Sequence, residues 1–243
     1  MRRRSDVVEP LYQTTITCPC CEQAYKTSRV RPSFKVAVRR DADFCTYYKS
    51  GAVNPEYYVV RVCPRCGFAS TENAVQQLSE RQKASYAARI GSSWQMRDYG
   101  GERSWQQALD CYKLALICAQ TIGDKDRIIA GLLHHIAWLY REHGDQEQEL
   151  RFLRFALDAY VRVYELEGSP DNQARLMYLM GELHRRLDEP YEAVKWFGRV
   201  INDKKIMDAA MIRASREQWQ VLREDMLQKR LELPEELENP GRA

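Results

Sequence analysis

Two short stretches, Cys18-Pro19-Cys20-Cys21 and Cys63-Pro64-Arg65-Cys66, share the pattern C-P-x-C. Two thiolates three residues apart on a tight turn can chelate one metal ion, and proline favours that turn. Two such turns supply four thiolates, which saturate Zn²⁺ in tetrahedral geometry and leave no position for a reacting water. We therefore predict one structural zinc ion, bound by Cys18, Cys21, Cys63 and Cys66.

The wider use of cysteine supports metal over disulfides. The chain has eight cysteines, and six of them lie in the first 66 residues without a recognisable secretion signal. A redox C-x-x-C site of the thioredoxin kind needs a βαβ context, which the sequence lacks. Cys111 and Cys118 are seven residues apart, on one face of an expected helix, and we expect both in the core.

Two further cysteines leave alternatives open. Cys20 lies inside the first turn and can replace a neighbour as ligand, although Cys18 and Cys21 keep the register of the second turn. Cys45, with Asp41 and Asp43, can form part of a second metal site. The simpler interpretation is that Cys45 is a small buried residue and that the aspartates cap a loop.

The segment around the cysteines has the pattern of short strands. Aromatic and β-branched residues stand at every second position in residues 12–16, 34–38 and 58–62. We expect a small β-rich, zinc-ribbon-like domain over residues 11–71, after a flexible leader at residues 1–10.

From about residue 72 the period of the apolar residues becomes that of helices, and about seven amphipathic stretches follow. The pattern around Leu133–Asp145 returns 44 residues later around Met177–Glu189. A helix pair of this kind buries its apolar face only by stacking on its neighbours. We expect a helical repeat domain over residues 72–233 and a tail at 234–243.

The helical part resembles the tetratricopeptide repeat. The residues that carry this resemblance are Ala137, Tyr140, Gly144-Asp145, Gly181, Ala193 and Phe197. The chain departs from that repeat in its spacing, about 41–44 residues instead of about 34, and in having Glu149 and His184 at two of its positions. The predicted class is α+β and mostly α, a zinc-ribbon-like domain followed by a TPR-like helical array.

The order of motifs resembles one bacterial family, domain of unknown function 2225. Its motifs match Cys18–Cys21, Asp41-x-Asp43-Phe44, Tyr48, Asn54–Tyr58, Val62–Ala69, Ala137–Arg141 and Tyr178–Leu183, within residues 10–225. The resemblance implies a zinc-ribbon-like head and a TPR-like body, with no established activity.

A partner-binding stripe is predicted on the helices. His134, Trp138 and Arg141 have the i, i+4, i+7 spacing that Tyr178, Glu182 and Arg185 repeat 44 residues later. In tetratricopeptide repeats this stripe lines the concave groove, so the resemblance implies a groove. Together with Arg175, these side chains suit an acidic or carboxylate-ended peptide. The alternative is that Trp138 and Tyr178 are core and the arginines a solvated face.

Three classes of function remain. The first is a zinc-containing scaffold or adaptor that binds a partner protein or peptide. The second is a nucleic-acid-associated factor that uses the basic head, although residues 1–80 carry only 12 Lys and Arg against 8 Asp and Glu. The third, an enzyme, is not predicted, because no phosphate loop, nucleophile elbow or H-E-x-x-H motif occurs. No segment is apolar enough to cross a membrane, and we expect a cytoplasmic protein.

Overall fold

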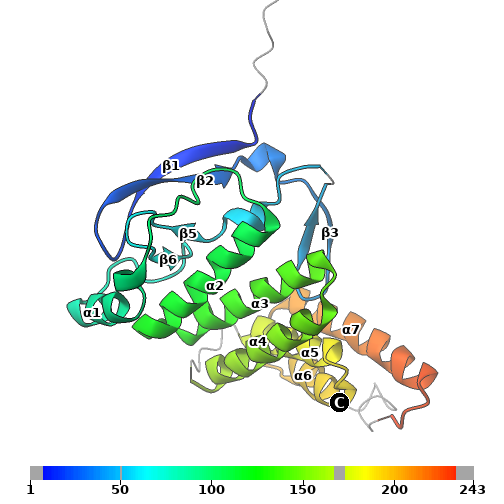
Figure 1. The fold of residues 1–243 in the computed structure, drawn as a ribbon. Coiled ribbons are helices and arrows are strands. Elements are labelled where there is room, and N and C mark those ends of the chain that lie inside the picture. The colour runs from blue at the N-terminus through cyan, green and yellow to red at the C-terminus, as the bar shows by residue number, and fades with distance from the viewer. Residues whose placement is uncertain (1–7, 50, 167–172, 234–243) are drawn as a thin grey trace, which may run out of the picture. The chain divides into compact units, whose positions relative to one another are not determined.

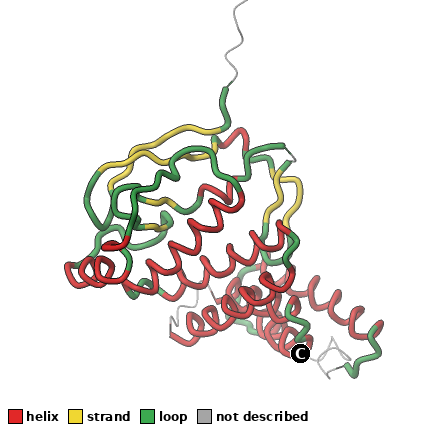
Figure 2. The backbone as a smooth tube through the Cα atoms, viewed as in Figure 1, coloured by secondary structure: helices red, strands yellow, loops and turns green. Residues whose placement is uncertain are grey.

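A computed structural model of the chain describes residues 8–49, 51–166 and 173–233. In this part it contains seven α-helices and six short strands, and the strands precede the helices (Figures 1 and 2). The predicted class, α+β and mostly α with about seven helices, is therefore confirmed. The likeness to the tetratricopeptide repeat stays a prediction. Except for residues 8–10, the expected leader at 1–10 and the expected tail at 234–243 lie outside the described residues.

The chain divides into two compact units. Unit 1 is residues 1–40 and 46–139, and unit 2 is residues 41–45 and 140–243. The chain passes between them at the tip of the hairpin of β3 (Ala37–Arg40) and β4 (Thr46–Tyr48), and again inside α3 (Asp126–His143). The predicted boundary at residues 71 and 72 stays a prediction, since compactness does not show which part folds alone.

The first hairpin of unit 1 frames the first cysteine turn. β1 (Leu11–Thr17) and β2 (Ala24–Val30) pair antiparallel, with Thr14 opposite Thr27. β1 coincides with the alternating residues 12–16, where a strand was expected. Because Cys18 follows β1 directly, the hairpin fixes where the first C-P-x-C turn begins.

The other two expected strands are shorter than their alternating patterns. Residues Pro32–Phe34 and Pro55–Tyr58 form 3₁₀ helices. The strand expected at residues 34–38 is therefore β3, which begins only at Ala37, and the strand expected at 58–62 is β5 (Arg61–Val62). Proline fixes φ near the helical value and cannot donate to a strand ladder, which explains both departures. The side chain of Asn54 caps the second 3₁₀ helix by accepting a hydrogen bond from the backbone of Glu56 at 3.0 Å.

Helix α2 (Trp105–Ile122) begins with a capping box. The Ser104 hydroxyl accepts a hydrogen bond from the Gln107 amide at 3.2 Å, and the Gln107 side chain accepts one from the Ser104 amide at 2.9 Å. The helix ends at Gly123, which has φ 62°, the left-handed conformation that glycine tolerates.

Helix α2 supports the second cysteine turn. It packs against α1 (Glu80–Arg89) and against the strand pair β5 and β6 (Ala69–Ser70) that flanks the turn. Cys111 and Cys118 are fully buried, which confirms that both are core residues. The Cys118 sulfur accepts a hydrogen bond from the Ala69 amide at 3.5 Å, so the helix contacts the strand that leaves the turn.

Unit 2 is helical. It holds the end of α3, then α4 (Gln146–Leu166), α5 (Gln173–Arg186), α6 (Pro190–Asn202) and α7 (Ala209–Gln228). Helix α5 packs against α4, α6 and α7. It approaches α6 closely at Gly181, where a Cβ atom would lie 2.8 Å from Cδ1 of Phe197. A small residue is therefore required at this crossing.

Candidate metal centre

The first cysteine turn is closed by two backbone hydrogen bonds. The Cys18 amide donates to the carbonyl of Gln23 at 3.0 Å, and the Glu22 amide donates to the carbonyl of Cys18 at 2.9 Å. The chain thus reverses within one short loop, which brings Cys21 back beside Cys18.

The second turn repeats this pattern position by position. The Cys63 amide donates to the carbonyl of Phe68 at 3.0 Å, and the Gly67 amide donates to the carbonyl of Cys63 at 2.9 Å. Gly67 has φ 76° and its counterpart Glu22 has φ 60°. The two C-P-x-C segments are therefore two copies of one turn, as the shared sequence pattern predicts.

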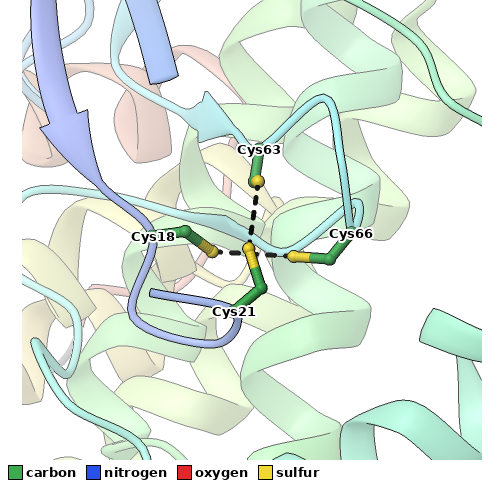
Figure 3. A group of neighbouring side chains, drawn as sticks. All are labelled: Cys18, Cys21, Cys63 and Cys66. Atoms are coloured by element: carbon green, nitrogen blue, oxygen red, sulfur yellow. Dashed lines mark hydrogen bonds between the residues drawn. The ribbon is translucent and has the colours of Figure 1, made fainter. Parts of the chain in front are cut away.

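The two turns bring four sulfur atoms together (Figure 3). The Cys18 and Cys66 sulfurs are 3.6 Å apart, those of Cys21 and Cys63 are 3.7 Å apart, and all four lie within 4.8 Å of one another. Four sulfurs around a zinc ion at about 2.3 Å would be about 3.8 Å apart. A disulfide would need about 2.05 Å, and all four cysteines are free. The four residues can hold one tetrahedral metal ion.

The sulfurs also influence one another's protonation. Hydrogen bonds from Cys18 and then Cys66 lower the pKa of the Cys63 thiol. The hydrogen bond to Cys63 raises the pKa of Cys18, and the hydrogen bonds to Cys18 and Cys63 raise the pKa of Cys66. One thiolate is thus stabilised by its neighbours, and a bound cation would favour the deprotonated form of the others.

Aromatic side chains of unit 1 support the second turn. The Tyr86 hydroxyl donates to the carbonyl of Cys66 at 2.7 Å, and the Trp94 indole donates to the carbonyl of Pro64 at 2.9 Å. The Trp94 ring lies directly against Gly67, where it leaves no room for a Cβ atom. These contacts hold the turn in place from outside the sulfur cluster. The sequence pattern did not predict a role for either aromatic residue, because both lie in a stretch with no motif.

Cys20 and Cys45 are not among the four cysteines placed to share an ion, although the Cys20 thiol is hydrogen-bonded to Cys66. Among the described residues, the only group of three or more His, Cys, Asp or Glu side chains placed to share a metal ion is the four cysteines above. Cys20 lies in the same turn, partly exposed, and Cys45 is buried in unit 2. The structure thus agrees with the interpretation of Cys45 as a small buried residue.

The chain matches one known protein family. A family model described as "Uncharacterized protein conserved in bacteria (DUF2225)" matches residues 11–222, which include both cysteine turns and all of α1 to α6. The chain belongs to the DUF2225 family. A search of curated proteins returned no match. Within the described ranges, no helix of this DUF2225 protein has the length and apolar character needed to span a membrane.

The residues predicted to line a groove are divided between the units. His134 and Trp138 belong to unit 1, where their rings pack 4.6 Å apart and His134 is 2% exposed. Arg141, Arg175, Tyr178, Glu182 and Arg185 belong to unit 2. His134, Tyr178 and Glu182 are buried, and the groove-lining role of the seven residues stays a prediction.

A loop of the DUF2225 chain itself contacts the predicted stripe in unit 2. Nη2 of Arg141 lies 2.7 Å from Oδ2 of Asp43, and Nη1 donates to Asp43 Oδ1 and to Asp41 Oδ2, each at 3.1 Å. Nε of Arg141 donates to Glu149 at 2.7 Å. The Asp43 side chain is completely buried. Arg141 therefore binds three carboxylates. The two aspartates thus form ion pairs with Arg141, a role beyond the loop capping that was expected of them.

The aromatic part of the same loop is held in a similar way. The Tyr178 hydroxyl donates to the carbonyl of Ala42 at 2.9 Å, and its ring lies 5.6 Å from the ring of Phe44. The guanidinium of Arg175 lies 4.4 Å from the centre of the Phe44 ring. Three of the predicted residues, Arg141, Arg175 and Tyr178, thus contact one acidic and aromatic segment.

The last two predicted residues bind each other. Arg185 donates to Glu182 at 2.7 and 2.9 Å, and Arg186 donates to it at 2.8 Å. Arg186 also lies 3.4 Å from Asp41 and 3.5 Å from Asp43, a role that the stripe pattern missed. Glu182 is fully buried under the two arginines, so it positions them and is closed to a partner.

A separate polar cluster in unit 1 was also missed. Nδ1 of His135 lies 2.9 Å from a carboxylate oxygen of Glu56, and the Tyr112 hydroxyl donates to the Glu56 carbonyl at 3.0 Å. Burial raises the pKa of Glu56, but the hydrogen bond and charge of His135, the hydrogen bond of Tyr48 and the charge of Lys35 together lower it more, and the net pKa lies below the ordinary value. Glu56 and His135 are far apart in sequence and belong to no common motif.

Proposed function

We propose that this DUF2225 protein is a zinc-containing scaffold that binds an acidic, aromatic segment of a partner protein through its helical unit. Two observations support the proposal, one for each part. The four sulfurs have the spacing of a tetrahedral zinc site. The loop Asp41–Phe44 contacts the predicted binding residues as a bound peptide would, and this observation is the main support for the scaffold role.

The metal part of the proposal follows from the donor set. Tetrahedral coordination by four thiolates is typical of zinc or of an iron–sulfur site. A saturated site has no open position for substrate or water, so we assign the ion a structural role and propose no catalysis there. Elemental analysis of the purified full-length protein should find one zinc per chain, and a double Cys63→Ser, Cys66→Ser variant should lose it. Iron in place of zinc, or equal zinc in the variant, would contradict this assignment.

The recognition part follows from the chemistry of the loop contacts. A bidentate Arg141–Asp43 pair fixes the acidic residue, and Arg175 over the ring of Phe44 fixes the aromatic one. The Tyr178 hydroxyl adds a hydrogen bond to a backbone carbonyl, a group that a partner segment of any sequence has. Together they suit a partner segment in which an acidic residue precedes an aromatic one.

A partner must compete with the loop for these residues. A tethered segment acts at an effective concentration of roughly millimolar, so a free peptide of equal affinity is largely excluded from the wild-type protein. Weakening the loop should therefore expose the site. A double Asp43→Asn, Phe44→Ala variant removes the buried charge and the ring that occupy it.

The test uses a labelled peptide with the sequence of residues 39–46, carrying serine in place of its cysteine. We expect the double variant to bind this peptide at least about tenfold more tightly than the wild type. On the double-variant background, Arg175→Ala should weaken binding. Arg213→Ala, an exposed arginine of the same unit, should not.

Three results would count against the scaffold role. They are no binding by a folded double variant, equal binding of a scrambled peptide, and equal effects of the two arginine substitutions. Circular dichroism and zinc content check that each variant is folded. Zinc content is measured separately, so the metal and recognition parts can fail independently.

A further inference from the structure

A cavity of about 360 Å³ lies in unit 1, and none of the four cysteines of the cluster lines it. It is lined by residues of β1, β2 and the two 3₁₀ helices, and by the segment that follows β6. Its volume is within the range of small-molecule sites. The polar and aromatic residues that matter for its chemistry are Tyr12, Arg29, Lys35, Tyr58, Arg61 and Glu72.

The charge of this lining is unbalanced. Three cationic side chains, Arg29, Lys35 and Arg61, face one carboxylate, Glu72. Glu72 pairs with Arg29, and both side chains are well exposed, at 54% and 38%. The carboxylate of Glu56, which lies near Lys35, is hydrogen-bonded to His135. The cavity therefore has an excess of positive charge.

Arg61 is a lining residue whose surroundings require explanation. Its Nε atom is buried and has no hydrogen-bond partner among the described residues. A buried polar atom without a partner is costly, and a charged one more so, unless a ligand or water completes the site. A second arginine in the same lining adds like-charge repulsion that an anion would relieve.

We propose that this cavity binds a small molecule that carries a phosphate group. The planar forks of two arginines match the oxygens of a phosphate, and Lys35 adds a third positive charge for a group with more than one negative charge. The Tyr12 and Tyr58 side chains supply an apolar wall beside the cations. The volume exceeds that of phosphate alone, so it leaves room for the rest of the molecule.

The test is calorimetric titration of pyrophosphate into the full-length protein, with citrate as a carboxylate of similar charge. We expect pyrophosphate to bind more tightly than citrate. Arg61→Gln should weaken pyrophosphate binding roughly tenfold or more. Glu72→Gln should strengthen it several-fold, because it releases Arg29 from its ion pair and changes only an exposed side chain.

Arg81→Gln is the matched control, because Arg81 is an exposed arginine of the same unit outside the cavity. It should leave the affinity for pyrophosphate unchanged. The proposal is overturned if pyrophosphate gives no heat at millimolar concentration, if citrate binds equally well, or if Arg81→Gln weakens binding as much as Arg61→Gln. Should Arg61→Gln fail to fold, Arg29→Gln replaces it, and Glu72→Gln still tests the predicted gain.

Discussion

Glu22 and Gly67 occupy the same position in the two cysteine turns, and both have left-handed backbone conformations, with φ 60° and φ 76°. Glycine adopts this conformation without strain, whereas glutamate does not. In addition, the Trp94 ring lies where a side chain at position 67 would begin. The two positions share a conformation and differ in how much substitution they tolerate.

Opposite substitutions at these positions should therefore have opposite effects. Gly67→Ala should lower the free energy of unfolding by about 2–5 kcal/mol, through left-handed strain and overlap with Trp94. Glu22→Gly should raise the melting temperature slightly by relieving the strain. Urea and thermal unfolding of the metal-loaded protein measure both. Glu22→Gln removes the ion pair with Lys83 but keeps the backbone strain, so an equal rise for Glu22→Gln would show that strain is not the cause.

Cys66 and Cys20 should differ in their effect on metal content. Cys66→Ser removes a sulfur that lies 3.6 Å from that of Cys18, within the group of four, and should abolish stable zinc binding. Cys20→Ser changes a sulfur outside that group and should leave about one zinc per chain. A chelator competition assay followed by elemental analysis distinguishes the two. Loss of zinc from Cys20→Ser would mean that Cys20 is a ligand.

The sequence was sufficient to predict features encoded by local chemistry. The two C-P-x-C turns have the same backbone pattern because both have cysteine, proline and cysteine at the same three positions. Gly181 lies at a helix crossing where only a small residue fits. Strand β2 was missed for a local reason too. Thr27 and Ser28 are both buried, so polar residues occupy positions where an apolar pattern was sought.

Features that depend on pairing distant segments were not predictable from one sequence. Arg141 and the loop aspartate Asp41 are 100 positions apart, and Glu56 and His135 are 79 apart. Periodicity predicted that Arg141 lies on a helix, as it does in α3, but gave no information on which residues contact its side chain. From the sequence alone, an acidic loop and a basic stripe in one chain can bind each other or can each bind a partner protein.

The Glu56–His135 pair predicts a specific dependence of stability on pH. Because the folded pKa of Glu56 is below its ordinary value of about 4.3, its ionised form stabilises the fold. That contribution is complete above the unfolded pKa and is lost as the pH falls through the folded pKa. The difference in unfolding free energy between wild type and Glu56→Gln should therefore be largest near neutral pH and shrink below about pH 4.

Urea unfolding of both proteins between about pH 3 and pH 7 measures this difference. Acid also releases thiolate-bound metal, but it does so in both proteins and cancels in the comparison. Parallel stability curves across the range would show that Glu56 contributes equally in both protonation states, and the inferred role of its hydrogen bond with His135 would be wrong.

Arg103 should be among the most sensitive positions of unit 1. It is 5% exposed, and its Nη1 donates to the carbonyls of Tyr57 and Val60 at 2.8 and 2.7 Å, while its Nε donates to the carbonyl of Tyr99 at 2.8 Å. Arg103 thus joins two segments of unit 1. One is Tyr57–Val60, which precedes β5 and the second cysteine turn, and the other is the segment just before α2. Lysine has one ammonium group and cannot reach three carbonyls spread around a planar fork.

Arg103→Lys should lower the free energy of unfolding by about 2–4 kcal/mol, because it leaves buried carbonyls without donors and a buried charge poorly solvated. Arg97→Lys, at an exposed arginine of the same segment, is the control and should change stability by less than about 0.5 kcal/mol. Denaturant unfolding at neutral pH measures both. Since Val60 immediately precedes β5, which leads into the second cysteine turn, Arg103→Lys should also release zinc faster to a chelator than Arg97→Lys does. Equal stabilities and equal release rates would show that the carbonyl contacts of Arg103 do not support the metal centre.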